Sequence, residues 1–507
     1  MTNPVKVILG CPSEHHAWVK YTVDTLMMPR GVVPRYSTVV RDASNCVRYL
    51  APNAYDACSL AGVKLRYLPH LWQASAQSQR TLLKDQVAAW QQVGSWRADG
   101  TVPMVDVIWM AFQLLASADE QRTGTRRAAR GTYTGSVFEE LRIPQDLGER
   151  CSAWLILRLM EAGIVPNDRA DFAGKWPMDA KYVIVLSHDV DFVPEGPLDT
   201  AKQCIKTLFR HAVKERSARE TLLAARGMLS AVANGRDLYG CVPEIIDRER
   251  SLGVKSSFQV AVGHRHPEDV NYRIEKDATR DYLKAIVDAE FDLCLHGSYR
   301  ATESLEWYRD EVALLTNRLG RPSGSRQHFL SFCYEALFAC LEATELEFDM
   351  SMGYPDHTGA RNGLLHPYFP FSMTEERAFD VVELPLVLMD VTLRAYMKMK
   401  HEAAWEHIRS VVDQIARTGG CGSIVWHPIV FGNARDPGYG ELYWKLIDYV
   451  QDTGGLATDG ATMNRHWRVR AARYDSFRDL PRVAVARNHA GSNSNDAALD
   501  LGTTGNA

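Results

Sequence analysis

The chain has no long apolar run and no closely spaced pair of cysteines. No stretch approaches the roughly 18 apolar residues of a membrane span. The N-terminal stretch MTNPVKVILGCPSE lacks both the basic region and the continuous apolar region of a signal peptide. The ten cysteines show no CxxC spacing, so neither a disulfide framework nor a cysteine-based zinc site is indicated. We therefore expect a protein of the reducing cytoplasm without a transmembrane segment.

The sequence also lacks the marks of a nucleic-acid or dinucleotide-binding protein. A net charge of −4 does not indicate a nucleic-acid partner, and no Gly-rich phosphate loop is present. The apolar content of 46% and the charged content of 24% are typical of globular proteins. With 507 residues the chain has room for about three domains, although one barrel can take up half of that length.

A polar segment bounded by prolines, PNDRADFAGKWP at 166–177, marks a domain boundary. We expect a smaller α/β domain at 1–165, a linker at 166–180, a second α/β domain at 181–470 and a tail at 487–507. The tail is rich in Asn, Gly, Ser and Ala, which predicts disorder. In the first domain the pattern predicts strands at 5–9, 36–40 and 64–68, and helices at 15–28, 106–116 and 149–162.

From residue 182 onward, strand-like and helix-like segments alternate. Such alternation predicts a parallel sheet, and this many repeats without a phosphate loop favour a barrel over an open dinucleotide-binding sheet. Strands are expected at 182–186, 256–262, 291–295, 326–332, 346–350, 381–389 and 423–426. Helices are expected at 243–252, 277–289, 305–319, 334–344, 403–417 and 441–451.

The stretch YVIVLSHDVD, at 182–191, reads as a buried strand that stops in polar residues. Asp189 and Asp191 should point the same way on an extended segment, and together they could divide metal binding and proton transfer. Capping of the following helix is the simpler alternative. Later strands also end in polar residues, and side chains at the same end of successive barrel strands converge. These residues are His296, Arg326 with His328, Asp349, Asp390 and His427.

Residues 200–234 are helical in composition and basic. Between 201 and 236 there are eight Lys or Arg residues and two Glu residues. A basic amphipathic helix can lie on an anionic membrane surface. It can equally be a solvated helix packed on its own domain, and we expect the second arrangement.

The order of strand-HDVD, strand-HGSY, RQH and strand-WHP resembles the polysaccharide deacetylase family, also called carbohydrate esterase family four. The match covers roughly residues 180 to 465. It implies a distorted (β/α)7 barrel that removes acetyl groups from glycans with a divalent metal, often zinc. The first part of the chain more loosely resembles the accessory α/β domain that precedes some such barrels.

Carried over position by position, the resemblance implies roles for five residues. Asp189 resembles the general base and Asp191 the metal-binding carboxylate. His296 resembles the first metal histidine, Arg326 the arginine that orients the base, and His427 the histidine that protonates the leaving group. A protonated His427 needs a carboxylate nearby, and both Asp390 and Asp349 qualify.

The sequence departs from the family at one metal position. The family pattern is His-x-x-x-His, but here the second position is Arg300, which cannot ligate a metal. His328, at a neighbouring strand end, is our replacement candidate; a hydrogen bond within the site is the alternative. His264 and His266 have ligand-compatible spacing in a charged loop and are weaker candidates.

We therefore expect a cytoplasmic, metal-dependent hydrolase of carbohydrate metabolism that deacetylates an amino sugar or glycan intermediate. Two alternatives remain: a non-catalytic carbohydrate-binding or scaffolding barrel, and a hydrolase of a non-sugar amide. Side chains that could contact a substrate, or equally serve in packing, are Tyr299, Tyr354 and Trp426 for a sugar ring and Arg361 for an anionic group.

Overall fold

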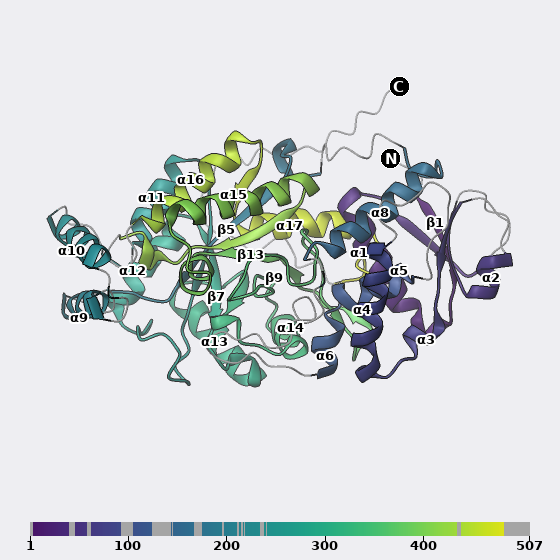
Figure 1. Ribbon diagram of the computed structural model, residues 1–507. Helices are drawn as coiled ribbons and strands as arrows, with labels where there is room; N and C mark the ends of the chain where they lie inside the picture. The colour runs from purple at the N-terminus through teal and green to yellow at the C-terminus, as the bar shows by residue number, and fades with distance from the viewer. Residues whose placement is uncertain are drawn as a thin grey trace, which may run out of the picture.

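The structure is a computed structural model of the chain, and its two larger sheets are both parallel (Figure 1). It describes residues 4–39, 46–57, 62–92, 105–123, 143, 145–166, 175–194, 197–209, 212–213, 216, 218–233, 238–239, 241–432 and 438–480.

The N-terminal sheet has four parallel strands in the order β2-β1-β3-β4. They span Val5–Gly10 (β1), Pro34–Ser37 (β2), Cys46–Leu50 (β3) and Val63–Arg66 (β4). The sequence pattern does not predict β3, because Arg48 interrupts its apolar run, yet this arginine is fully buried. The helices of this region are α1 (His16–Met27), α2 (Pro52–Ala57), α3 (Pro69–Trp72), α4 (Ala76–Gln92), α5 (Val107–Leu115), α6 (Ala118–Thr123) and α8 (Leu147–Glu161).

The second sheet closes on itself as a barrel. Its strands pair in parallel in the order β12-β9-β8-β7-β6-β5-β14-β13. They span Val183–Val190 (β5), Ser257–Val260 (β6), Asp292–Gly297 (β7), Gly324–Gln327 (β8), Phe348–Asp349 (β9), Val382–Glu383 (β12), Leu386–Met389 (β13) and Cys421–Val425 (β14). Only Leu384 and Pro385 separate β12 from β13, so one continuous segment pairs first with β9 and then with β14. Counting that segment once, the barrel has the seven strand positions predicted from the sequence.

Helices supply the crossovers that a parallel sheet requires. They are α9 (Pro197–Phe209), α10 (Ala218–Ala233), α11 (Val242–Ser251), α12 (Asp277–Asp288), α13 (Leu305–Arg318), α14 (Tyr334–Ala343), α15 (His401–Thr418), α16 (Tyr439–Asp452) and α17 (Gly460–Ala471). A short antiparallel pair, β10 (Phe371–Ser372) and β11 (Arg377–Ala378), and a further strand, β15 (Leu456–Thr458), complete the fold. The sequence pattern does not predict β15 or α17.

The central strand β5 is buried along its whole length and alternates between two environments. Ile184 and Leu186 pack in the apolar layer shared with the barrel helices. Val183 and Val185 pack inside the barrel base. This period of two is the one expected for a strand, and it directs Asp189 to the same side as Val183 and Val185.

The base of the barrel shares an apolar core with the N-terminal region. One buried cluster contains Trp109 of α5, Val183 and Cys421 at the starts of β5 and β14, and Phe477 beyond α17. The amino ends of the strands are therefore covered by the N-terminal region, and the carboxyl ends lie on the opposite side.

Two predicted elements differ from the structure. The basic helix expected at 200–234 is divided into α9 and α10, and Arg216 between them has φ +49°, a left-handed conformation that a helix does not continue through. The strand expected at 326–332 ends at Gln327, because Phe329 and Leu330 have φ values of +56° and +51°. That turn places His328 beside the strand ends.

Part of the predicted linker and all of the predicted tail lie outside the described residues. Within 166–180, residues 167–174 are not described, whereas Lys175 and Trp176 are buried. Residues 487–507 are not described. Among the described helices, none is long and apolar enough to cross a membrane.

Candidate active site

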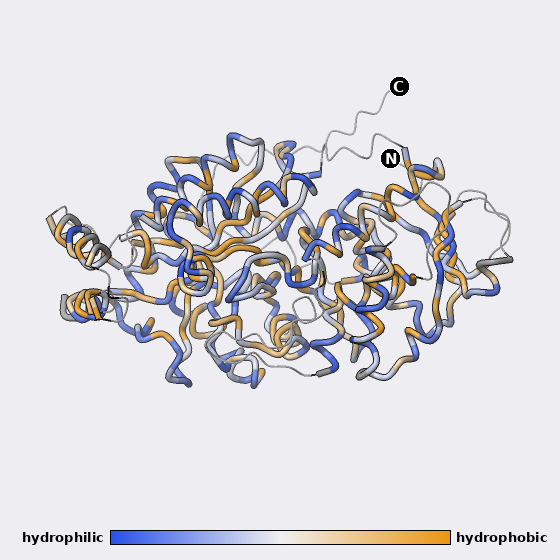
Figure 2. Tube along the Cα trace, viewed as in Figure 1, coloured by the Kyte–Doolittle hydropathy of each residue, from blue (hydrophilic) through white to orange (hydrophobic). Residues whose placement is uncertain are grey.

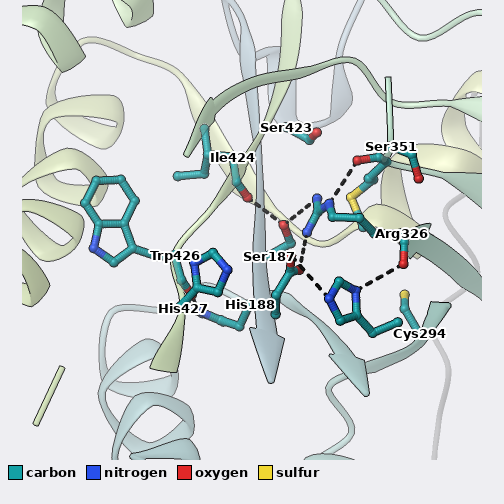
Figure 3. A network of polar contacts seen from close by, with 12 residues as sticks. Ser187, His188, Cys294, Arg326, Ser351, Ser423, Ile424, Trp426 and His427 are labelled. Carbon is teal, nitrogen blue, oxygen red and sulfur yellow. Dashed lines mark hydrogen bonds and ion pairs between the residues drawn. The ribbon is translucent and has the colours of Figure 1, made fainter. Parts of the chain in front are cut away.

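At the carboxyl end of β5, the Asp189 carboxylate is bound by a fully buried arginine. Arg326 Nη1 donates to Asp189 Oδ1 at 2.6 Å, and Nη2 donates to Ser187 Oγ at 2.9 Å. The Arg326 Nε atom donates to the Met350 carbonyl at 2.9 Å, and Ser187 Oγ donates to the Ile424 carbonyl at 2.5 Å (Figure 3). The sequence reasoning assigns no role to Ser187, although it stands two residues before Asp189 and so faces the same side.

This arrangement keeps Asp189 ionised. Burial acts to raise the pKa of the carboxyl group, but the positive charge of Arg326, and then those of His296 and His427, lower the pKa below its usual value. A buried carboxylate that is fixed by an arginine and ionised at neutral pH can accept a proton from a reacting water.

Three imidazoles surround Asp191, the next carboxylate of the motif. On one side, His296 Nε2 lies 3.4 Å and His328 Nε2 lies 3.7 Å from Oδ1. On the other side, His427 Nε2 lies 3.6 Å from Oδ2. Burial acts to raise the pKa of Asp191, but a contact with His296 and the electrostatic interactions with the surrounding imidazoles lower it.

The donors on the Oδ1 side fit a divalent metal. One ligand atom each from Asp191, His296 and His328 lie within 4.8 Å of one another, and Oδ1 is buried without a hydrogen-bond partner. Ligands of a tetrahedral zinc, at about 2.1 Å from the ion, stand about 3.4 Å apart, close to the 3.4 and 3.7 Å separations found here. Burial lowers the pKa of His328 to about 4, which leaves its imidazole neutral as a metal ligand must be. His296 Nδ1 donates to the Arg326 carbonyl at 3.1 Å, so its Nε2 is turned toward the cluster.

His427 is paired with Asp390, not with Asp349. His427 Nδ1 donates to Asp390 Oδ1 at 2.6 Å, and both side chains are buried. Burial acts to lower the pKa of His427, but the charge of Asp390, its hydrogen bond and the two motif carboxylates raise the pKa to about 9. His427 is therefore a protonated imidazole at neutral pH, with its Nε2 turned toward the site.

Asp349 does not lie beside His427, the position considered for it in the sequence analysis. Its two oxygens accept hydrogen bonds from Ser351 N at 2.7 Å and from Ser351 Oγ at 3.0 Å. Burial raises the pKa of Asp349 to about 6. The side chain thus stabilises the β9 end near Arg326. Of the two carboxylates that the sequence left open for His427, the one that contacts it is Asp390.

Arg300 lies outside this cluster. Its Nε donates to Glu303 at 2.6 Å, and about half of its side chain is exposed. Arg300 precedes a short turn at Ala301–Glu303, and the second imidazole of the cluster is His328, which directly follows β8. His188 points to the helix side of β5, where Nε2 lies 2.9 Å from Glu249 Oε1.

The other side chains considered for substrate contact are engaged in packing. Trp426 is fully buried and its Nε1 donates to the Tyr439 carbonyl at 3.1 Å. Tyr354 is buried against His357. The Arg361 guanidinium forms two hydrogen bonds with Glu120 of α6, at 2.8 and 2.9 Å, so it joins the barrel to the N-terminal region. The weaker ligand candidates His264 and His266 lie outside the cluster around Asp191.

No protein-family model matches the chain, and no curated protein sequence matches it. Among solved structures, the chain is similar to a protein from Mycobacterium smegmatis described as a polysaccharide deacetylase, with 17% identity and a TM-score of 0.38 over 58% of this chain and 93% of that one. It is also similar to Puue allantoinase, with 14% identity and a TM-score of 0.38 over 58% of this chain and 92% of that one.

Proposed function

We propose that the chain is a metal-dependent hydrolase that removes an acetyl group from an amino sugar or a glycan intermediate. The proposal rests on the placement of three imidazoles around the two carboxylate oxygens of Asp191. Two ligand-type imidazoles lie on its Oδ1 side, and a charged imidazole lies on its Oδ2 side. An amide hydrolase needs these elements together with a base, and Asp189 stands two residues away.

In this proposal each side chain has a defined task. Asp191, His296 and His328 would hold a divalent cation, for which zinc is the expected ion. Such a cation, when bound, polarises an acyl oxygen and lowers the pKa of a water molecule. Asp189 accepts the proton of the attacking water while Arg326 keeps its carboxylate in place. His427, charged and fixed by Asp390, donates a proton to the departing amine or alcohol.

A metal-content measurement tests the cluster directly. Purified protein should hold near-stoichiometric metal, and Asp191→Ala or His328→Ala should lose most of it. His264→Ala is the matched control, because this histidine contacts the Val270 carbonyl and stands outside the cluster. Metal retention in both cluster variants would contradict the ligand set and favour the alternative in which the barrel binds sugars without catalysis.

Acetate release from N-acetylated amino sugars, with zinc or cobalt added, tests the reaction. Asp189→Asn should keep its metal and lose about 10²- to 10⁴-fold in rate, which is the usual contribution of a general base. Equal rates for Asp189→Asn and the wild-type protein would remove the proposed base. Turnover of simple non-sugar amides, but not of acetylated sugars, would support a hydrolase whose substrate is a non-sugar amide.

A further inference from the structure

Exposed apolar side chains gather on the helix pair α9–α10 and its connection. Elsewhere among the described residues, such side chains lie at least 20 positions apart in the sequence. Within the part of the chain that the structure describes, five of the eleven large exposed apolar residues lie between positions 205 and 229: Ile205 (68% exposed), Phe209 (55%), Val213 (52%), Leu222 (70%) and Leu229 (72%).

In α9, basic and apolar residues share one face. Lys202, Ile205, Lys206 and Phe209 stand at i, i+3, i+4 and i+7, a spacing that places them in one stripe, and all four are exposed. On the opposite face, Thr207 is buried. The helix therefore uses one side for packing and presents a mixed basic and apolar side to the surroundings.

The second helix repeats this division. In α10, Leu222, Arg226 and Leu229 stand at i, i+4 and i+7, and all three are exposed. Ala224 and Met228, on the other side, are buried in the core of the barrel domain. Packing within the protein thus covers one face of each helix and leaves the other face exposed.

The helix pair stands at the mouth end of the barrel. α9 begins at Pro197, six residues after Asp191, and so follows the carboxyl end of β5. In Figure 1 the two helices project from the barrel at the end away from the N-terminal sheet, and in Figure 2 both carry hydrophobic and hydrophilic segments. A surface bound by this pair would lie on the same side of the molecule as the candidate site.

We propose that the α9–α10 pair docks on an anionic lipid surface. Bulky apolar residues interleaved with Lys and Arg are the composition of interfacial helices, whose apolar side chains enter the headgroup region while the cations reach lipid phosphates. Residues 197–233 contain seven Lys or Arg and three Asp or Glu, so the charge of the pair complements that of an anionic leaflet. A second copy fits less well, because a two-fold contact through the same stripes would bring Lys202, Lys206 and Arg226 of both copies together.

Co-sedimentation of the full chain with vesicles tests the docking surface. Binding should be strong to vesicles of phosphatidylcholine with phosphatidylglycerol, weak to phosphatidylcholine alone, and reduced by salt. The double variant Lys202→Gln/Lys206→Gln should weaken binding by about fivefold per lysine. Ile205→Gln/Leu229→Gln should weaken it by about tenfold or more, because each loses an apolar side chain from the bilayer.

Matched controls lie on exposed positions away from the pair. Lys84→Gln/Arg473→Gln removes two exposed basic residues, and Leu157→Gln/Val469→Gln replaces two exposed apolar residues. Both controls should bind vesicles as the wild-type protein does. The proposal is overturned if a control loses as much binding as its matched variant, or if the protein binds both vesicle types equally. It is also overturned if the protein self-associates and only the helix variants abolish that association. No substrate is added, so the result is independent of the proposed reaction.

Discussion

Asp191 faces imidazoles on both of its carboxylate oxygens, and the two sides differ in charge state. His328 is neutral because burial lowers its pKa to about 4, whereas His427 is charged because Asp390 helps to raise its pKa to about 9. One carboxylate can therefore serve a metal on one side and orient a proton donor on the other.

The pair formed by His427 and Asp390 leads to a prediction about two aspartates. Asp390→Asn removes the charge that keeps His427 protonated, so acetate release should fall by about 10²- to 10³-fold. Asp349→Asn removes a carboxylate that contacts Ser351 and Glu383 and does not contact His427, so the rate should fall by less than about tenfold. kcat/KM for the two variants gives the comparison, and metal content should stay unchanged in both. Equal losses would contradict the assignment of Asp390.

For single residues, the sequence predicts which strand ends have candidate site residues, but it does not predict which of these side chains contact one another. The period of two along β5 is enough to group Asp189 with Asp191. It is not enough to choose Asp390 over Asp349, since both follow strand-like segments. The approach of His328 depends on left-handed Phe329 and Leu330, which no apolar pattern reveals because such conformations are unusual for non-glycine residues.

At the scale of elements, β5 is tied to its neighbours by a buried polar network on its helix side. His188 Nδ1 donates to the Trp426 carbonyl at 2.6 Å, next to His427. Glu249 of α11 contacts His188 and accepts hydrogen bonds from Ser256 Oγ, at 2.7 Å, and from the Tyr443 hydroxyl. The strand that carries the motif is thus fixed to β14, α11 and α16.

Removal of Glu249 should therefore destabilise the barrel. Glu249→Ala leaves His188 and two hydroxyl groups buried without their common partner, which should lower the free energy of unfolding by about 3–5 kcal/mol. Glu441→Ala, on α16, is the matched control, because its side chain is 63% exposed; its effect should stay within about 0.5 kcal/mol. Urea unfolding at constant m-value measures both. Similar effects for the two variants would mean that the network does not stabilise the barrel.

Element boundaries follow the sequence where a regular pattern ends at a glycine. The helix expected at 149–162 corresponds to α8, and Gly163 behind it has φ +66°. The basic segment shows the limit, since composition alone predicts one helix where Arg216 turns the chain between two. β3 shows a second limit of prediction from the sequence, because Arg48 is buried only through its tertiary contacts.

At the scale of the whole molecule, the N-terminal region meets the barrel through buried charge as well as apolar packing. His366 contacts the Glu149 carboxylate of α8 through Nδ1 and the Lys175 Nζ atom through Nε2. Lys175 also donates to the Gly419 carbonyl at 2.8 Å. Trp176 stacks on the His366 ring, with centroids 5.9 Å apart. Segments more than 190 positions apart in the chain thus meet at one imidazole.

This junction should make stability depend on pH. Burial lowers the pKa of His366 to about 4; the charges of Lys175 and Arg30 act in the same direction, and Glu149 opposes them. In the unfolded chain the histidine titrates near 6.5, so between about pH 6.5 and 4 the unfolded state binds more protons at this site. The contribution of His366 is therefore complete above pH 6.5 and is lost as the pH falls toward 4, by about 1.4 kcal/mol per pKa unit.

The variant His366→Gln isolates this contribution from those of other buried acids. Its unfolding free energy should differ most from that of the wild-type protein above pH 6.5, and the difference should shrink as the pH approaches 4, because the wild-type protein then has to protonate a buried imidazole or unfold. His70→Gln, at an exposed position on α3, controls for the loss of one imidazole. Urea titrations at several pH values measure the difference directly. A difference that stays constant from pH 7 to pH 4 would mean that His366 does not titrate on unfolding, and the predicted pH dependence of this junction would be rejected.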